Sequence, residues 1–187
     1  VFNEDHRGDG IQHAALTVKD ILSAVEGMRR AGVEFMPTPG SYYDALPERI
    51  KRYPLIGRHS RDESYFLPMY LGDYRAVEYL TGRPDWDGRT LVVMGTSMGG
   101  QQSLAVASLH PKVNAVIANV PSGADVAGPL LGRAPSYPRW EVERPEVLET
   151  AAYFDPANFA PRIRARTLLS LGFIDETSAP TSIWAVY

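Results

Sequence analysis

The alternation of apolar and polar residues along this chain predicts strands and helices that follow one another. Continuous apolar runs at residues 91–94, 113–120 and 167–173 predict buried strands, since a half-exposed strand would alternate apolar with polar positions. Residues 62–80 carry apolar side chains at helical spacing, and residues 101–109 are rich in alanine and leucine, so both predict helices. Strands that alternate with helices at this spacing predict a parallel α/β sheet.

The first part of the chain predicts a smaller unit. Residues 10–18 predict a strand, residues 21–31 an amphipathic helix, and residues 33–36 a second short strand. Residues 51–61 combine proline, glycine and charge without periodicity, which is typical of a junction. We therefore expect three parts, namely a β-α-β segment at 1–50, a junction at 51–61 and an α/β core at 62–187.

A sharp turn is predicted where the first apolar run of the core meets its helix. The run leads into the pattern Gly-x-Ser-x-Gly, formed by Gly95, Ser97 and Gly99. A strand, tight turn and helix in this order are what a nucleophile elbow requires, with small residues two positions to either side of the serine. The Ser97 hydroxyl would stand clear of the sheet, and the Met98 N–H would point at a developing oxyanion. In the alternative interpretation, the serine only caps the helix.

A candidate acid follows the last predicted strand. Asp175 comes just after residues 167–173, at the sheet edge where the acid of a hydrolase triad belongs. The alternative is that Asp175 caps a helix predicted for residues 177–186. Between these two candidates, residues 124–146 are rich in glycine, proline, arginine and aromatic residues, which is typical of a lid or an interface.

Composition narrows the function classes. The formal net charge of −3 and the isoelectric point near 5.8 argue against a dedicated nucleic-acid binder. The sequence has no cysteine, which excludes disulfides, thiolate catalysis and zinc–cysteine sites. No apolar run is long enough to span a membrane, and the first residues do not form a signal peptide, so we expect a soluble, cytoplasmic protein.

The core resembles a known family of esterases. The segments YLGDYRAVEYLTGRPDWDG, TLVVMGTSMGGQQSLAVASLHPKVNAVIANVPSGAD, YFDPANFAPRIRA and LGFIDETSAPTSIWAVY are similar to the acetyl xylan esterase/cephalosporin-C deacetylase family of α/β-hydrolases, over residues 57–187. The resemblance implies Ser97 as nucleophile, Met98 as an oxyanion donor and Asp175 as triad acid. It also implies a small ester or acetylated sugar as substrate, no cofactor, and a homo-oligomer.

The first part of the chain resembles a different family. The segment GIQHAALTVKDILSAVEGMRRAGVEFMPTPGSYYDALPERI is similar to the C-terminal module of 4-hydroxyphenylpyruvate dioxygenase, a vicinal-oxygen-chelate fold. The resemblance makes His13 a weak candidate for an Fe(II) ligand. A facial triad needs two further ligands, and in that family they lie outside the stretch present here, so we expect no metal.

Together these features predict a chimera with an impaired esterase. The expected fold is a partial α/β-hydrolase parallel sheet with helices on both faces, preceded by the β-α-β segment. In the family, the catalytic histidine follows the acid by about one helix and one strand, whereas this sequence runs only to Tyr187. Because a serine hydroxyl is a poor nucleophile without a base, we expect weak turnover. A catalytically inactive chimeric scaffold is the second hypothesis, and an Fe(II)-dependent dioxygenase fragment is the third.

Overall fold

A computed structural model describes residue 30 and residues 56–187. The chain divides into two compact units, residues 1–46 and residues 47–187. The β-α-β segment predicted for residues 10–36 lies outside the described residues except for Arg30, which is helical and exposed. The three-part division expected from the sequence, at 1–50, 51–61 and 62–187, stays a prediction.

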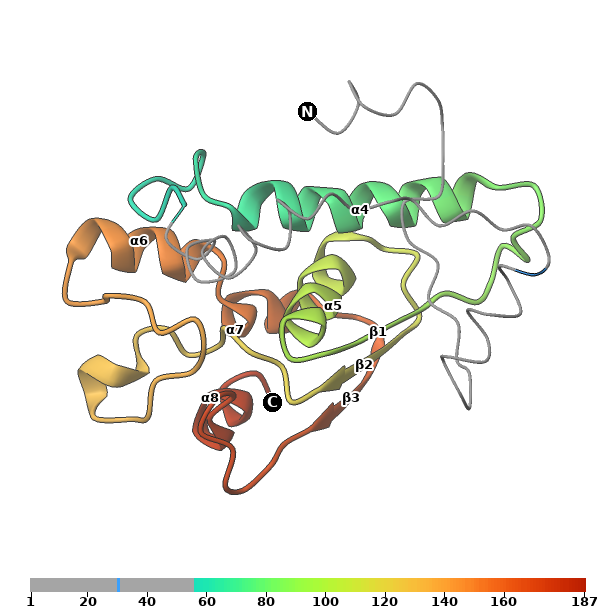
Figure 1. The fold of residues 1–187 in the computed structure, drawn as a ribbon. Helices are drawn as coiled ribbons and strands as arrows, with labels where there is room; N and C mark the ends of the chain where they lie inside the picture. Colours follow the sequence, from blue (N-terminus) through green and yellow to red (C-terminus); the bar gives the residue numbers. More distant parts are fainter. Residues whose placement is uncertain (1–29, 31–55) are drawn as a thin grey trace. The chain divides into compact units, whose positions relative to one another are not determined.

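Helices and strands alternate through the second unit (Figure 1). In chain order they are α4 (Phe66–Gly82), β1 (Val92–Thr96), α5 (Met98–Leu109), β2 (Ala115–Asn119), the 3-10 turn η2 (Gly128–Leu131), α6 (Pro145–Tyr153), α7 (Pro156–Phe159), the 3-10 turn η3 (Ala160–Arg162), β3 (Arg166–Ser170) and α8 (Pro180–Trp184).

The three strands form one parallel sheet in the order β1-β2-β3. Residues paired across parallel strands lie on the same face, so Gly95, Ala118 and Leu169 share one face, and Met94, Ile117 and Leu168 share the other. The predicted parallel α/β architecture is confirmed.

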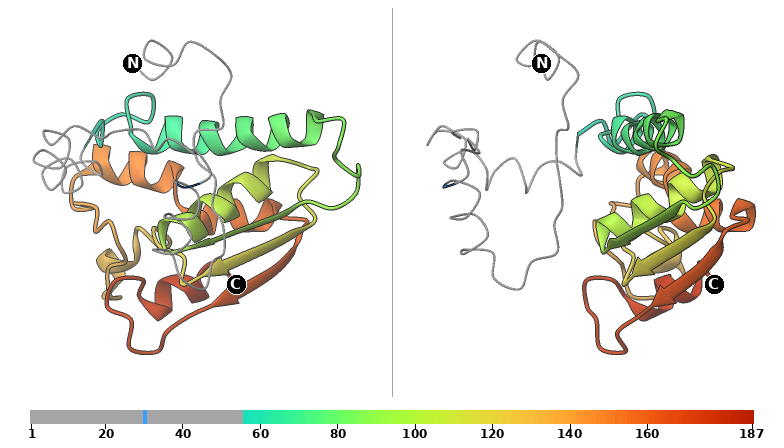
Figure 2. Two further views of the ribbon diagram at one scale, coloured as in Figure 1. Left: turned by 45° about the vertical axis from the view of Figure 1, so that its right-hand side comes forward. Right: turned by 90° about the vertical axis from the view of Figure 1, so that its right-hand side faces the viewer.

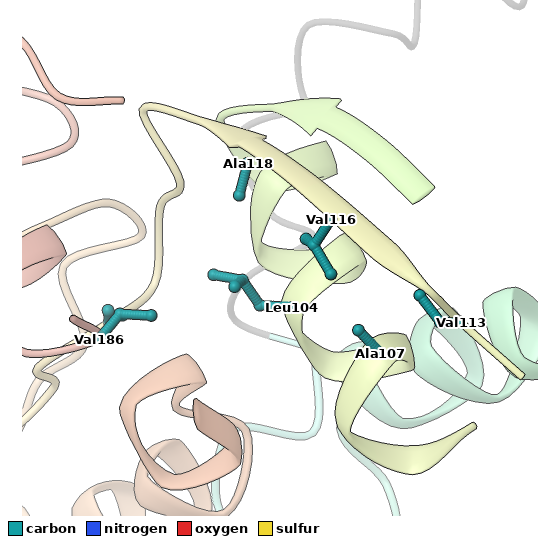
Figure 3. Close-up of a cluster of buried hydrophobic side chains, with 7 residues drawn as sticks. Leu104, Ala107, Val113, Val116, Ala118 and Val186 are labelled. Carbon is teal, nitrogen blue, oxygen red and sulfur yellow. The ribbon is translucent and has the colours of Figure 1, made fainter. Parts of the chain in front are cut away.

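The main apolar core lies between β2 and α5 (Figure 3). Val116 and Ala118 point from β2 toward Leu104 and Ala107 of α5, and Val186 approaches the same cluster from beyond α8. Leu104 is fully buried, and burial of a side chain of that size stabilises the fold by about 2 kcal/mol. This core packs the second half of α5 against β2.

A second, aromatic cluster joins α4 to the other side of α5. It contains Phe66, Tyr70, Ala105, Phe154 and Phe159, and the Tyr70 ring meets the Phe154 and Phe159 rings edge to face at 5.8 and 5.6 Å between centroids. The two views of Figure 2 show α5 between α4 and the sheet. Helices α5 and α4 therefore form two successive layers on one face of the sheet.

The opposite face of the sheet remains open in the described part of the chain. Its apolar side chains include Val92, Met94 and Leu168, which are 48%, 67% and 60% exposed. The second helical layer expected from the sequence is not found among the described residues.

Two predicted elements are shorter than expected. The strand predicted to reach Phe173 ends at Ser170, because its partner β2 ends at Asn119. The helix predicted from Thr177 begins only at Pro180. Proline favours the first helical position, and the residues before it form a turn instead of a helix.

Across residue 30 and residues 56–187, no helix is both long enough and apolar enough to cross a membrane.

Asp73 of α4 allows the fold to be tested by measuring how stability depends on pH. Its Oδ2 atom is buried without a hydrogen-bond partner among the described residues, and burial raises the pKa of Asp73 from 3.8 to about 6. The folded state holds this proton more tightly than the unfolded state, so the carboxyl group lowers stability as pH rises from about 4 through about 6. Asp73→Asn is expected to raise the free energy of unfolding by about 1 kcal/mol at neutral pH, with partial exposure allowed for, and by almost nothing near pH 3.5.

Urea unfolding of the full chain at both pH values measures this effect. Asp62→Asn is the matched control, because the Asp62 side chain is 78% exposed. An Asp73→Asn gain that is the same at both pH values would contradict the assignment.

Candidate active site

The turn between β1 and α5 has strained backbone geometry at its centre. Ser97 has φ 56° and ψ −117°, a conformation that residues with a side chain rarely adopt and that costs about 1–3 kcal/mol. Its side chain makes no capping hydrogen bond to α5, so the alternative in which Ser97 serves as the helix cap is wrong. Ser97 is half-buried, and its hydroxyl is not used to stabilise the helix.

Backbone hydrogen bonds hold this strained residue on both sides. The Ser97 N–H donates to the Asn119 carbonyl at 2.9 Å, and the Ser97 carbonyl accepts from the N–H groups of Gln101 at 3.0 Å and Ser122 at 3.2 Å. The end of β2 and the first turn of α5 therefore both fix the serine.

The two glycines of the pattern contribute unequally. A Cβ atom placed on Gly95 would overlap the backbone of Gly99, whereas one placed on Gly99 would meet no described atom within 4 Å. The close approach therefore demands a glycine at position 95, and position 99 contributes its backbone to the contact.

Met98 is the first residue of α5, so its N–H has no acceptor within the helix. A free N–H beside the serine, at the positive end of the helix dipole, is suited to stabilise an oxyanion.

A buried network of hydrogen-bonded side chains, which the sequence did not reveal, joins the first turn of α5 to α4. The Gln101 amide donates to the Tyr70 hydroxyl at 2.8 Å and accepts from the Ser122 hydroxyl at 3.3 Å. Tyr70 donates in turn to the Phe154 carbonyl at 2.8 Å, and burial raises the pKa of Tyr70, so the phenol stays protonated. Gln101 and Ser122 are 2% and 0% exposed. Because these residues lie far apart in the sequence, no local pattern could have identified the network.

Asp175 lies beyond β3 in a tight turn. One carboxylate oxygen, Oδ1, accepts from the N–H groups of Thr177 and Ser178, each at 2.8 Å. These N–H groups precede α8, whose N-cap is Ala179, so Asp175 closes a turn and does not cap that helix. The second oxygen, Oδ2, takes part in neither of these bonds.

The fold brings the serine and the aspartate to the same edge of the sheet. Both β1 and β3 run parallel to β2 and flank it, so their carboxyl ends lie about 10 Å apart (Figure 1). Ser97 follows β1 directly, and Asp175 is the fifth residue after the end of β3.

Neither described histidine makes a hydrogen bond to Ser97 or Asp175. His110 stands at the opposite end of α5 from Ser97, and a helix of 12 residues separates them by about 18 Å. His59 accepts at Nε2 from Arg58 at 3.4 Å, and its Nδ1 lies 3.8 Å from Glu146. His6 and His13 lie outside the described residues.

Residues 56–187 and residue 30 contain no group of three or more His, Cys, Asp or Glu side chains that could hold a metal ion. The weak candidacy of His13 as an iron ligand therefore stays untested.

Two known families match different parts of the chain, and the boundary between the two matches coincides with the boundary between the two compact units. The family described as acetyl xylan esterase (AXE1) matches residues 47–127 and 137–187. The glyoxalase/bleomycin resistance protein/dioxygenase superfamily matches residues 3–47. Residues 128–136 fall between the two ranges matched by the esterase family. The two resemblances found in the sequence are confirmed, and they belong to different segments.

Individual relatives agree with this division. Acetyl esterase Axe7A of Xylanibacter ruminicola is 40% identical over 139 residues, which cover 72% of this chain and 32% of that protein. The acetyl xylan esterase structure from Paenibacillus sp. R4 superposes with a TM-score of 0.64 at 27% identity, over 72% of this chain and 46% of the other. A 4-hydroxyphenylpyruvate dioxygenase of Caenorhabditis elegans is 42% identical over 55 residues, which are 29% of this chain and 14% of that protein. This chain thus spans a third to a half of its esterase relatives and a smaller share of the dioxygenase.

The unequal glycines give a direct test of the turn. Gly95→Ala is expected to lower the free energy of unfolding by about 2 kcal/mol, because the added methyl group forces the Gly99 backbone away. Gly99→Ala is the matched control and should change stability by less than about 0.5 kcal/mol, because its methyl group meets open space. Urea unfolding midpoints of the full chain measure both, and equal losses would contradict the geometry.

Proposed function

Because the chain belongs to the acetyl xylan esterase family, we propose that it carries the nucleophile and the acid of a carboxylic-ester hydrolase that acts on acetyl esters of sugars or small alcohols. The observation that carries this proposal is the backbone of Ser97, held at φ 56° between β1 and α5 with a hydroxyl that caps nothing.

In the proposed reaction, the Ser97 Oγ attacks the acyl carbonyl carbon and loses its proton to a base. The carbonyl oxygen becomes an oxyanion that accepts from the Met98 N–H, which the helix leaves without an acceptor. Collapse of this intermediate expels the alcohol and leaves an acetyl–serine ester, which water then hydrolyses.

Asp175 is proposed to orient the base. Its Oδ1 accepts from two backbone N–H groups, which fix the orientation of the carboxylate. The remaining oxygen is suited to accept from an imidazole N–H and to stabilise the imidazolium that forms.

We propose that turnover is impaired, because His110 lies at the far end of α5 from Ser97 and His59 is hydrogen-bonded to Arg58 and not to Ser97. Without a base in hydrogen-bond reach, the oxyanion donor and substrate binding supply only part of the acceleration of a complete triad. The same observation favours the second candidate, an inactive chimeric scaffold in which the turn is purely architectural. A homo-oligomer stays a prediction.

A fluorophosphonate probe, with labelling read by intact mass, separates these two candidates. The esterase proposal expects one adduct on the wild-type chain and none on Ser97→Ala. Ser108→Ala at the far end of α5 is the control and should label like wild type. A well-folded wild-type chain that takes up no probe would favour the scaffold.

Free imidazole tests the missing base. If the nucleophile and the oxyanion donor are in place, added imidazole should accelerate p-nitrophenyl acetate hydrolysis by wild type over Ser97→Ala, with an increase that follows the fraction of neutral imidazole. A rate difference that imidazole leaves unchanged would show either that a base already serves Ser97 or, if the difference is zero, that Ser97 is not a nucleophile.

A further inference from the structure

The buried amide of Gln101 lies one helical turn after Ser97. The Gln101 N–H donates to the Ser97 carbonyl at 3.0 Å, so this residue is attached to the serine turn through its backbone. Its side chain is only 2% exposed. Gln101 can therefore act on the candidate site from the protein interior, without touching a substrate.

Both ends of this amide are used, and they are not interchangeable. The Tyr70 hydroxyl donates its one proton to the Phe154 carbonyl at 2.8 Å, so toward Gln101 it can only accept, from Nε2 at 2.8 Å. The Ser122 hydroxyl donates to Oε1 at 3.3 Å. Such a network holds its members in one arrangement, because breaking any of these bonds leaves a buried polar group unpaired.

The segment that leaves β2 packs on the face of the same amide. A Cβ atom placed on Gly123 would lie 2.6 Å from both Cδ and Nε2 of Gln101, so the glycine backbone lies directly against the amide. The neighbouring Ser122 N–H donates to the Ser97 carbonyl at 3.2 Å. Gln101 therefore fixes residues 122 and 123 at the point where they meet the serine turn.

This segment needs such support, because its backbone is strained where it begins. Val120 has φ 39°, which is a rare conformation for a β-branched residue and costs about 1–3 kcal/mol. Strain of this kind persists only where surrounding contacts determine it. The contacts of Gln101 with Ser122 and Gly123 are suited to that role, since they lie two and three residues further along the chain.

The segment is connected in turn to the candidate acid. The Gly123 N–H donates to the Tyr137 carbonyl at 2.8 Å, and the Tyr137 N–H donates to the Thr177 carbonyl at 2.7 Å. The Thr177 N–H donates to Asp175. The position of residues 122 and 123 therefore also determines where the turn that Asp175 closes is attached.

We propose that Gln101 is a positioning residue, which fixes the turn of the candidate acid relative to the candidate nucleophile by holding residues 122 and 123. It touches neither the substrate nor the reacting atoms, and it acts through the backbone hydrogen bonds of Gly123 and Tyr137. The inference rests on the proposed function, since it gives Gln101 a role at the same pair of residues, Ser97 and Asp175.

Two substitutions separate positioning from packing. Gln101→Met keeps the length of the side chain but removes both of its hydrogen bonds. Gln101→Glu keeps the shape, and the neutral acid can donate to Tyr70 and accept from Ser122 as the amide does. Its carboxylate has no proton to donate, so the bond to Tyr70 is lost as pH rises through the pKa of the new carboxyl, which burial places above the usual value of about 4.3. Asp73 and Asp155, the acids that act on Tyr70, titrate in the wild type as well, so each comparison with wild type is made at one pH.

Amide signals of the full chain measure the effect away from the substitution. Ile117 lies in the central strand, and the hydrogen-exchange protection of its N–H reports overall stability. In Gln101→Met, protection of the Gly123 and Tyr137 N–H groups should fall by about tenfold more than this reference. An equal loss at all three amides would show that Gln101 only stabilises the fold, and it would overturn the inference.

Gln101→Glu gives the same test within one variant, and it serves even if Gln101→Met does not fold. Its Gly123 and Tyr137 amide signals should match wild type near pH 5 and depart from it by about pH 8. Signals that match wild type at both pH values would overturn the inference.

Gln102→Met is the matched control. Gln102 is the next glutamine of α5, and its amide donates to the Met98 carbonyl within the helix at 3.3 Å. This variant should leave the protection of Gly123 and Tyr137 as in wild type. A selective loss at these amides in both Met variants would contradict a role that belongs to Gln101.

Fluorophosphonate labelling keeps this inference distinct from the esterase proposal. Where wild type labels on Ser97, Gln101→Met should label about tenfold more slowly, because the segment that holds the Ser97 carbonyl through Ser122 is no longer fixed. Selective loss of protection at Gly123 and Tyr137 in a chain that takes up no probe supports the positioning role and contradicts the esterase. Labelling of Ser97 in a chain whose Gln101→Met variant keeps both the rate and the protection overturns the positioning role and leaves the esterase standing.

Discussion

The positive φ at Ser97 is the constraint on which the rest of the proposed site depends. A strained backbone at this residue costs about 1–3 kcal/mol and persists only where its surroundings determine it. Here the surroundings are the Asn119 carbonyl, the N–H groups of Gln101 and Ser122, and the contact between Gly95 and the following helix. Each of these contacts lies at the junction of β1, β2 and α5. The parallel sheet and its core therefore hold Ser97 in the conformation that keeps its hydroxyl clear of the helix.

A short series of hydrogen bonds connects the turn at Ser97 to the turn at Asp175. The Ser122 N–H donates to the Ser97 carbonyl, and the Gly123 N–H donates to the Tyr137 carbonyl at 2.8 Å. Tyr137 donates to the Thr177 carbonyl at 2.7 Å, and the Thr177 N–H donates to Asp175 at 2.8 Å. The segment around Tyr137 thus bridges the serine turn and the acid turn.

The parts of the fold and of the candidate site that depend on neighbouring residues could be predicted from the sequence. The turn at Ser97 was predictable because an apolar run, two glycines and a helix follow one another within a few residues. The end of β3 and the start of α8 were not predictable from local sequence. β3 stops where its partner β2 stops, and a hydrogen bond to Asp175 places Thr177 in a turn. The network of Tyr70, Gln101 and Ser122 leaves no local pattern, because its members meet only after α4 packs against α5.

A crystal structure of the chain after reaction with a phosphonate ester tests the central claim most directly. The account predicts a covalent bond from phosphorus to the Ser97 Oγ, an unchanged positive φ at Ser97, and a phosphoryl oxygen about 3 Å from the Met98 nitrogen. A structure in which Ser97 relaxes to a negative φ and its hydroxyl caps α5, with phosphorus on another residue or on none, would contradict the claim that this turn is built to present a nucleophile.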